Sequence, residues 1–519
     1  MKSNTLSNSQ NDALFLLVKS LTKSEKRQFN LYVGRLEGNT EAKFLSLFKL
    51  LDKMKVYDER VILKSGIVAK QQLSNLKAHL YKQLLISLRL NPAHQNIRVQ
   101  IREQLDFATV LYQKGLYKQS LKLLDKAKTM AIDNDEKNIA YEIVELEKVI
   151  ETQYITRSIS TRADELSEQS KELSMQNVIT SKLSNLSLQL YSVLLKIGYV
   201  RNDHELQQIK DYFVKRLPEY DYNTLGLREK LWLYKAHLWR SFLTQDFLQS
   251  YKYANKWVNL FKENPRIISL HPVFYLKGKN YLLESLFFIK HYQKFKEELH
   301  NFEQEIQRKN IPLNSNTEIL IFQYFSANQL HLHFLEGTFK EGEYLVDEIE
   351  QKISVYKNRL DEHHIVVLYY KIACLYFGMG ENKKCIGYLS KIINHKTVKS
   401  GEDLQCFARV LNLIAHYECG MDYHLERQFK DTYKFLLKME NLQAVQKEFI
   451  VSIKALSDVY PHEIKKEFKK IHARLLKFEN HPYEKRAFLY LDILSWLESK
   501  IENKSVGEII REKANKFIS

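Results

Sequence analysis

The sequence predicts an all-α protein built from helical pairs, and three observations support this prediction. The chain of 519 residues contains only 15 glycines and 7 prolines, too few for the many tight turns of a sheet protein. Leucine, lysine and glutamate, which are good helix formers, are abundant. A helix-turn-helix pattern recurs about every forty residues, and such units stack to bury a continuous core that no single pair can build.

Residues 1–95 are predicted to form a separate basic domain of five helices. The spacing of apolar residues predicts the first helix near 11–20, and the capping-box sequence Thr22–Glu25 marks the start of the second. The third helix is expected over 41–55. A short fourth helix ends at Ser65, and the fifth continues from there to about Leu90. The following Asn91-Pro92 ends the last helix, because proline cannot continue one.

The repeated pairs are predicted to occupy residues 96–440, followed by C-terminal helices over 441–519 that cap the stack. We expect eight pairs, because eight positions resemble the turn between the two helices of a pair. They lie near Gly115, Ser158, Gly198, Gln245, Lys290, Gly337, Gly380 and Gly420.

Two of the pairs carry a recognisable residue pattern. In each, a large residue and a small residue stand next to each other before the turn, and a small residue followed four positions later by a large one comes after it. The first pair has Phe107-Ala108 before the turn and Ser120 and Leu124 after it. The second has Ile372-Ala373 before the turn and Cys385 and Leu389 after it. This pattern resembles tetratricopeptide-repeat proteins. The resemblance implies a right-handed α-solenoid whose inner helices line a concave, peptide-binding groove. The spacing here exceeds the family's period of about 34 residues, so the family's groove shape is not carried over.

Candidate groove residues follow from the expected inner helices. Some members of the family hold a C-terminal carboxylate with lysine and asparagine, and the closest approach here, Lys235 with Trp239, lacks the asparagine. We therefore expect apolar or aromatic recognition by Tyr112, Lys235, Trp239 and Tyr370. The alternative is that many of these aromatic residues only pack between helices.

Positive charge is concentrated near the start of the chain. The formal net charge is +17, and residues 1–100 carry 17 lysines and arginines against 7 acidic residues. A candidate patch for an anionic partner comprises Lys19, Lys23, Lys26, Arg27, Lys64, Lys70, Lys77 and Lys82. The alternative function is therefore a regulatory factor that contacts nucleic acid or the ribosome through residues 1–95. A merely solvated lysine-rich surface is the simpler explanation of the same charge.

Signatures of enzymes are missing from the sequence. It contains no phosphate-binding glycine loop, no dinucleotide fingerprint, no nucleophile elbow and no zinc-protease helix. We expect no catalytic residues, no cofactor and no metal site. The four cysteines read as reduced core residues, and no membrane span or targeting segment is visible. The sequence thus favours a non-enzymatic cytoplasmic scaffold or adaptor for a protein or peptide partner.

Overall fold

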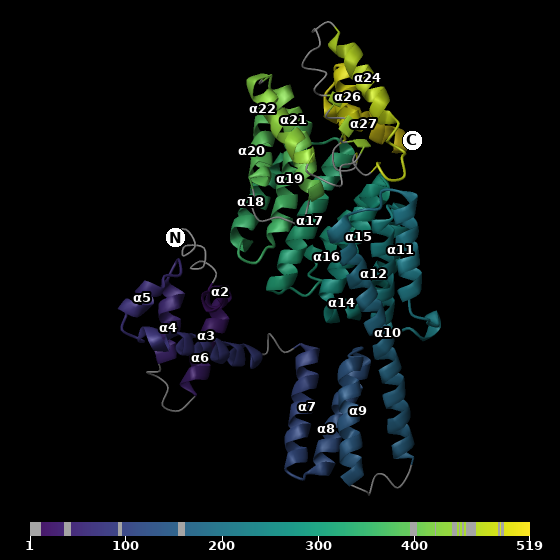
Figure 1. Cartoon of the computed structure of the whole chain (residues 1–519). Coiled ribbons are helices and arrows are strands. Elements are labelled where there is room, and N and C mark those ends of the chain that lie inside the picture. The colour runs from purple at the N-terminus through teal and green to yellow at the C-terminus, as the bar shows by residue number, and fades with distance from the viewer. Residues whose placement is uncertain are drawn as a thin grey trace. The chain divides into compact units, whose positions relative to one another are not determined.

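The computed structural model describes residues 12–35, 43–91, 96–153, 161–394, 402–420, 422–437, 463–485 and 492–518, with a few isolated positions between 444 and 488. In these residues the regular elements are helices and no strand occurs, so the predicted all-α class is confirmed (Figure 1). None of the helices in the described ranges has both the length and the apolar character needed to cross a bilayer.

The chain divides into two compact units, Met1–Leu173 and Ser174–Ser519. The first unit contains two hydrophobic cores, one among residues 14–88 and another among residues 97–173. The second unit also has two cores, which meet near the helices around residue 320. The predicted domain boundaries at 95 and 440 stay predictions.

The first core of the first unit is built by five helices: α2 (Ala13–Ser20), α3 (Lys23–Gly34), α4 (Lys43–Lys53), α5 (Glu59–Lys64) and α6 (Lys70–Arg89). The expected capping box is present at the start of α3. The backbone N–H of Glu25 donates to the Thr22 hydroxyl (3.2 Å), and the backbone N–H of Thr22 donates to the Glu25 carboxylate (2.6 Å). Both bonds satisfy backbone donors that lack partners at a helix start.

The second core of the first unit is built by α7 (Ile97–Gln113), α8 (Tyr117–Asp133), α9 (Lys137–Gln153) and the first part of α10 (Arg162–Ile197). Eight separate pairs would require a break within residues 162–197, and that part of the prediction is wrong. The stretch contains neither glycine nor proline, and it forms a single helix of 36 residues.

The second unit continues with many helices, most of them 12 to 22 residues long. They are α11 (Asp203–Arg216), η2 (Tyr222–Thr224), α12 (Leu227–Leu243), α13 (Phe247–Glu263), α14 (Arg266–Leu270), α15 (Pro272–Phe288), α16 (Tyr292–Gln307), α17 (Ser315–Glu336), η3 (Glu341–Glu343), α18 (Tyr344–Tyr356), α19 (Glu362–Met379), α20 (Asn382–Ile393), α21 (Glu402–Glu418), α22 (Asp422–Leu437), α24 (Ile464–Leu476), α26 (Ile493–Glu502) and α27 (Val506–Ile518).

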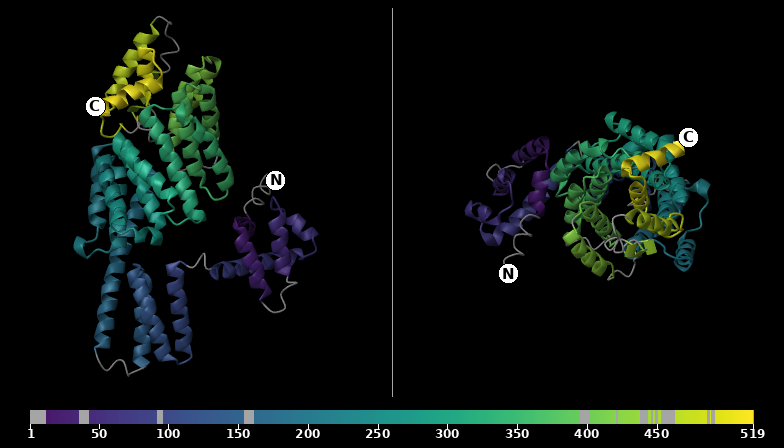
Figure 2. Two further views of the ribbon diagram at one scale, coloured as in Figure 1. Left: turned by 180° about the vertical axis from the view of Figure 1, so that it is seen from behind. Right: turned by 90° about the horizontal axis from the view of Figure 1, so that it is seen from above.

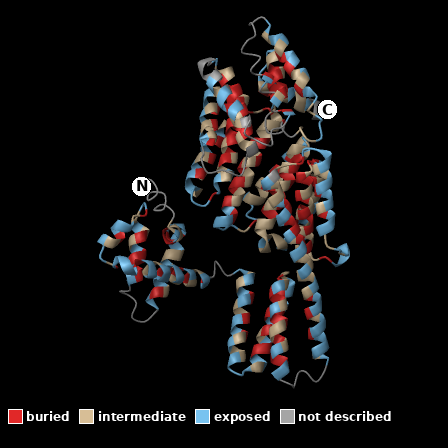
Figure 3. Cartoon of the chain, viewed as in Figure 1, coloured by how far each residue is buried: buried red, intermediate tan, exposed pale blue. Residues whose placement is uncertain are grey.

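Neighbouring helices of this unit pack side by side, as Figure 2 shows. The helices α12, α13, α15, α17 and α19 contact one another in that order, and α19, α20, α21 and α22 continue the series. The buried residues gather on the helix faces that meet other helices (Figure 3). Each helix thus buries an apolar stripe that it could not cover alone.

The positions predicted as turns separate helices where the structure describes them. Seven of the eight adopt the left-handed backbone conformation: Gly115, Gly198, Gly337, Gly380 and Gly420, together with Gln245 (φ 56°) and Lys290 (φ 53°). The non-glycine residues bear a cost of about 1 kcal/mol each in that conformation. The eighth position, Ser158, lies outside the described residues.

The C-terminal helix α27 packs against α16, α17 and α19 as well as α26. The contact is close at the end of α17, where a Cβ atom on Gly337 would lie 2.5 Å from the carbonyl oxygen of Gly507. Only glycine fits at this position, because it combines the left-handed turn (φ 65°) with the approach of a second backbone.

Candidate functional site

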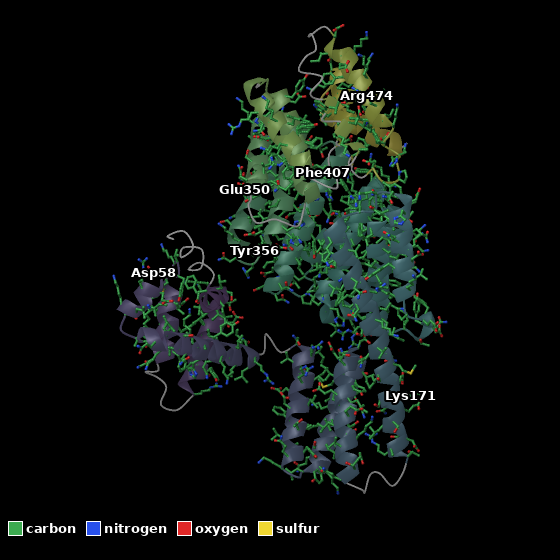
Figure 4. The ribbon with its side chains drawn as sticks, in the orientation of Figure 1. Asp58, Lys171, Glu350, Tyr356, Phe407 and Arg474 are labelled. Atoms are coloured by element: carbon green, nitrogen blue, oxygen red, sulfur yellow. The ribbon has the colours of Figure 1, made fainter. Side chains whose placement is uncertain are left out.

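A cavity of about 370 Å³ lies in the second unit, among α10, α12, α15, α17, α19 and α21. This volume falls within the range of ordinary ligand pockets, about 300–1,000 Å³. Ten of its lining residues are aromatic, among them Phe407 of α21, which is labelled in Figure 4. The aromatic lining residues are Tyr199, Trp239, Phe242, Tyr281, Phe287, Phe288, Tyr324, Phe334, Tyr370 and Phe407.

The aromatic rings hold one another in fixed orientations. Trp239 of α12 contacts Tyr191 of α10 (ring centroids 4.8 Å apart) and meets Tyr281 of α15 edge to face (5.6 Å, 74°). Phe242 contacts both Tyr281 (6.2 Å) and Phe288 (6.2 Å). Such contacts between rings on different helices make the wall rigid and apolar, which suits an apolar or aromatic group.

A small polar cluster interrupts this wall where α15, α17 and α19 meet. Lys371 donates a hydrogen bond to Nε2 of His331, and the His331 ring stacks on Phe287 (4.0 Å, 9°). Because Nε2 accepts this bond, the ring proton lies on Nδ1, which is buried and has no hydrogen-bond partner among the described residues. Next to them, Asn328 donates to the side-chain oxygen of Asn280 (3.1 Å). A pocket with few, fixed polar groups is typical of selective binding.

Burial shifts the pKa values of the groups in this cluster. Desolvation lowers the pKa of Lys371 to about 8, against the attraction of Glu284. Desolvation also raises the pKa of Glu284, although Lys371 and a hydrogen bond with Asn280 act in the opposite direction. The pKa of His331 falls well below its usual value, first through burial and then through Lys371. The ring of His331 is therefore neutral near pH 7.

A nucleophile of low pKa is not found at this site. Cys374 lines the cavity, but burial raises the pKa of its thiol to about 12, so it remains protonated. All four cysteines of the chain are free. Within the described residues, no group of three or more histidine, cysteine, aspartate or glutamate side chains is placed to hold a metal ion.

The structure brings two of the four predicted groove residues together. Trp239 and Tyr370 both line the cavity. Lys235 lies one helical turn from Trp239 on α12, with its ammonium 4.7 Å from the ring centre of Trp232. Tyr112 belongs to the first unit, where its ring contacts Tyr117 (6.0 Å).

Three of the eight predicted patch residues are engaged inside the N-terminal helices. Lys26 forms an ion pair with Asp52 (2.6 Å), and Lys19 donates to the backbone carbonyl of Asp52 (2.6 Å). Lys77 pairs with Asp12 and donates to the Tyr57 hydroxyl (3.0 Å). The other five side chains are exposed: Lys23, Arg27, Lys64, Lys70 and Lys82. Internal partners thus take part of the charge that suggested an anionic ligand.

Sequence reasoning missed most of the cavity residues, including Tyr281, Glu284, His331 and Lys371. One signal was present: Trp232 and Phe274, and likewise Trp239 and Tyr281, are 42 residues apart, which is one repeat. Equal spacing of large aromatic residues predicts equivalent positions on successive helices. The polar cluster gives no such signal, because its members come from three helices and are not separated by a common repeat distance in the sequence.

Comparison of the chain with known protein families, with curated proteins and with solved structures found no match.

Proposed function

We propose that this protein is a non-enzymatic cytoplasmic scaffold or adaptor that binds a protein or peptide partner in the cavity of its second unit. The observation that carries the proposal is the cavity itself, an aromatic-walled space of about 370 Å³ with a few fixed polar groups. An apolar side chain buried there would gain roughly 1.5–3 kcal/mol of transfer free energy. The polar cluster would then select the polar groups of the peptide next to that side chain.

The helical pairs are proposed to form a right-handed solenoid similar to tetratricopeptide repeats, with the cavity on its concave side. The order of packing from α12 to α22 and the recurring left-handed turns support this arrangement. In such an array the inner helices contribute equivalent positions to one continuous surface. A peptide can contact several inner helices at once on that surface.

The test is selection from a library of random octapeptides on beads, using the full chain as bait. Ala327 lines the cavity, so Ala327→Trp fills part of the space that an apolar side chain would occupy. We expect the wild-type chain to enrich a family of related peptides and Ala327→Trp to bind them at least tenfold more weakly.

The matched control is Ala473→Trp, which places the same ring on an exposed position of α24. This variant should bind the selected peptides like the wild type. Equal binding by the Ala327→Trp variant, or no enrichment by the wild type, would contradict the proposal. Recovery of RNA instead of protein from a native lysate would favour the nucleic-acid alternative.

A further inference from the structure

We propose that Lys235 and Lys277 form a subsite for an acidic side chain, so that the bound peptide carries aspartate or glutamate between two apolar residues. This inference rests on the proposed function, because it names the peptide whose apolar side chain enters the cavity of the second unit. The two lysines lie outside the cavity lining, each one helical turn from a residue that belongs to it, Lys235 from Trp239 and Lys277 from Tyr281. The two lysines lie on the neighbouring helices α12 and α15.

The register of two aromatic pairs places the lysines opposite each other. Trp232 meets Phe274 edge to face (5.7 Å), and Trp239 meets Tyr281 edge to face (5.6 Å). Both pairs join α12 to α15 with the same offset, so the two helices run parallel at this point. Lys235 and Lys277 are also 42 residues apart. On its own helix, each lysine lies three residues after the aromatic residue of the first pair and four before that of the second. The two lysines therefore lie at the same level of α12 and α15, and the charge of Lys277 acts on Lys235.

In the described parts of the chain, neither ammonium group has a carboxylate partner. Among the residues that the structure describes, neither lysine forms an ion pair within 4 Å. Both side chains are half-buried, and Lys235 feels the repulsion of Lys277 in addition to its burial. The charge of Lys277 also contributes, after burial, to lowering the pKa of His364, whose Nδ1 lies 3.5 Å from the carboxylate of Asp361.

The ring of Trp232 offsets only part of the charge of Lys235 (4.7 Å from the ammonium to the ring centre), and removing a charge from water costs free energy unless an opposite charge repays it. Two cations that share one level of a partly apolar surface also repel each other. A negatively charged group between them removes both costs. Charge complementarity thus defines the occupant as anionic.

The aromatic surface continues on both sides of the lysines, which favours an internal acidic residue over a chain end. Trp232 and Phe274 lie on one side, and Trp239 and Tyr281 lie on the other. The two aromatic levels are seven residues apart on each helix, which is about 10 Å. An extended peptide covers that length with about three residues. The expected motif is an acidic residue flanked by apolar residues about three positions apart.

The first arm of the test measures the stability of the protein without peptide. Lys277→Met keeps the apolar stem and removes the charge, so we expect the thermal midpoint of the full chain to rise by about 1–2 °C. Lys383→Met on α20 is the matched control, since Lys383 is exposed and should leave the midpoint unchanged. A thermal midpoint of Lys277→Met that is equal to or lower than that of the wild type would overturn the inference that the charges of the two lysines are uncompensated.

The second arm selects peptides from a random octapeptide bead library made once with free and once with amidated C-termini. We expect the wild-type chain to enrich an internal aspartate or glutamate between apolar residues in both forms. Lys235→Met and Lys277→Met should each weaken binding of the enriched peptides about tenfold. The double variant Lys235→Glu/Lys277→Glu should select lysine or arginine at the same position, and a purely structural pair of lysines would not produce that reversal.

The outcomes separate the two proposals. Enriched peptides that lack an acidic residue would overturn the lysine subsite while the proposed function stands. Enrichment restricted to peptides with a free C-terminus would overturn the internal acidic side chain in favour of a terminal carboxylate. Absence of any enrichment over Ala327→Trp would overturn the proposed function and this inference with it.

Discussion

The lysines of the N-terminal helices and those of the second unit's inner helices occupy opposite electrostatic situations. In the N-terminal helices α2–α6, the half-buried Lys26 and Lys77 have carboxylate partners, and the exposed lysines are surrounded by water. On α12 and α15, Lys235 and Lys277 are half-buried, and the charge of Lys277 helps to lower the pKa of Lys235. The N-terminal helices, where positive charge is concentrated, are therefore the ones whose half-buried lysines already have carboxylate partners.

This difference shows why net charge is a poor guide to a binding surface. An exposed lysine keeps its hydration and gains little from a new partner, since a surface ion pair contributes about 0–1 kcal/mol. A lysine that folding has already removed from water offers a larger gain, because its desolvation cost is borne before the ligand arrives. Substitution of the paired, the half-buried and the exposed lysines should therefore have different effects on stability and binding.

The largest effect is expected from removing a paired lysine. Lys77→Met leaves the half-buried Asp12 carboxylate without its cation and the Tyr57 hydroxyl without its donor. We expect the opening free energy of α2, α4 and α6 to fall by about 2 kcal/mol. Hydrogen exchange of these helices in the full chain measures this change, with Lys82→Met at an exposed position of α6 as the control. Equal protection in both variants would contradict the comparison.

An effect of opposite sign is expected on the inner helices. Lys235→Met removes one of two repelling, half-buried cations, so the second unit should become more stable by about 0.5 kcal/mol. Tryptophan fluorescence during urea unfolding follows this unit, because all four tryptophans of the chain lie in it. If Lys235→Met instead lowered the stability of the second unit, the two lysines would not differ in the sign of their effect, and the comparison with Lys77 would fail.

The gain from Lys235→Met should depend on pH. Burial and the repulsion of Lys277 lower the pKa of Lys235 to about 8, below its usual value of 10.5. Between these two pH values the unfolded chain holds the proton more tightly than the folded chain, so wild-type stability rises with pH. The advantage of Lys235→Met should therefore be complete below pH 8 and vanish by about pH 10.5. Urea unfolding of both proteins from pH 7 to pH 10.5 would show whether it does.

The smallest effect is expected from the exposed N-terminal lysines. Lys23→Glu, Lys70→Glu and Lys82→Glu combined should change peptide capture and thermal stability little, with each substitution contributing less than about 0.5 kcal/mol. The triple variant also tests the nucleic-acid alternative through binding to poly-uridine RNA at several salt concentrations. Strong wild-type binding whose salt dependence falls in the variant would show that these solvated cations do form a functional surface.

Much of the fold was predictable because its signals are local. The capping box at Thr22, the turn at Gly380 and the stop after Leu90 each depend on residues within a few positions of one another. The long helix α10 was mispredicted because the repeat pattern suggested a break that no residue in the stretch requires. Local helix propensity prevailed there over the period of the repeat.

The candidate site was much less predictable. Trp239 and Tyr370 were named as groove residues, but Glu284, His331 and Lys371 were not, although they come together in one polar cluster. No local pattern links these three residues, because their meeting depends on the lengths and packing of the helices between them. The partners of Lys77 and Lys26 were hidden for the same reason.

The sequence by itself determined the helical class, the turn positions and the excess of positive charge, because composition and short-range spacing set these properties. Tertiary structure alone decided which cations are paired, which are solvated and which are left within reach of another cation. The free energy of a charge depends on its burial and on the groups around it, and both are settled only when distant helices pack. Lys77 and Lys235 are the same residue type in predicted helices, and packing gave one a carboxylate and placed the other within reach of the charge of Lys277.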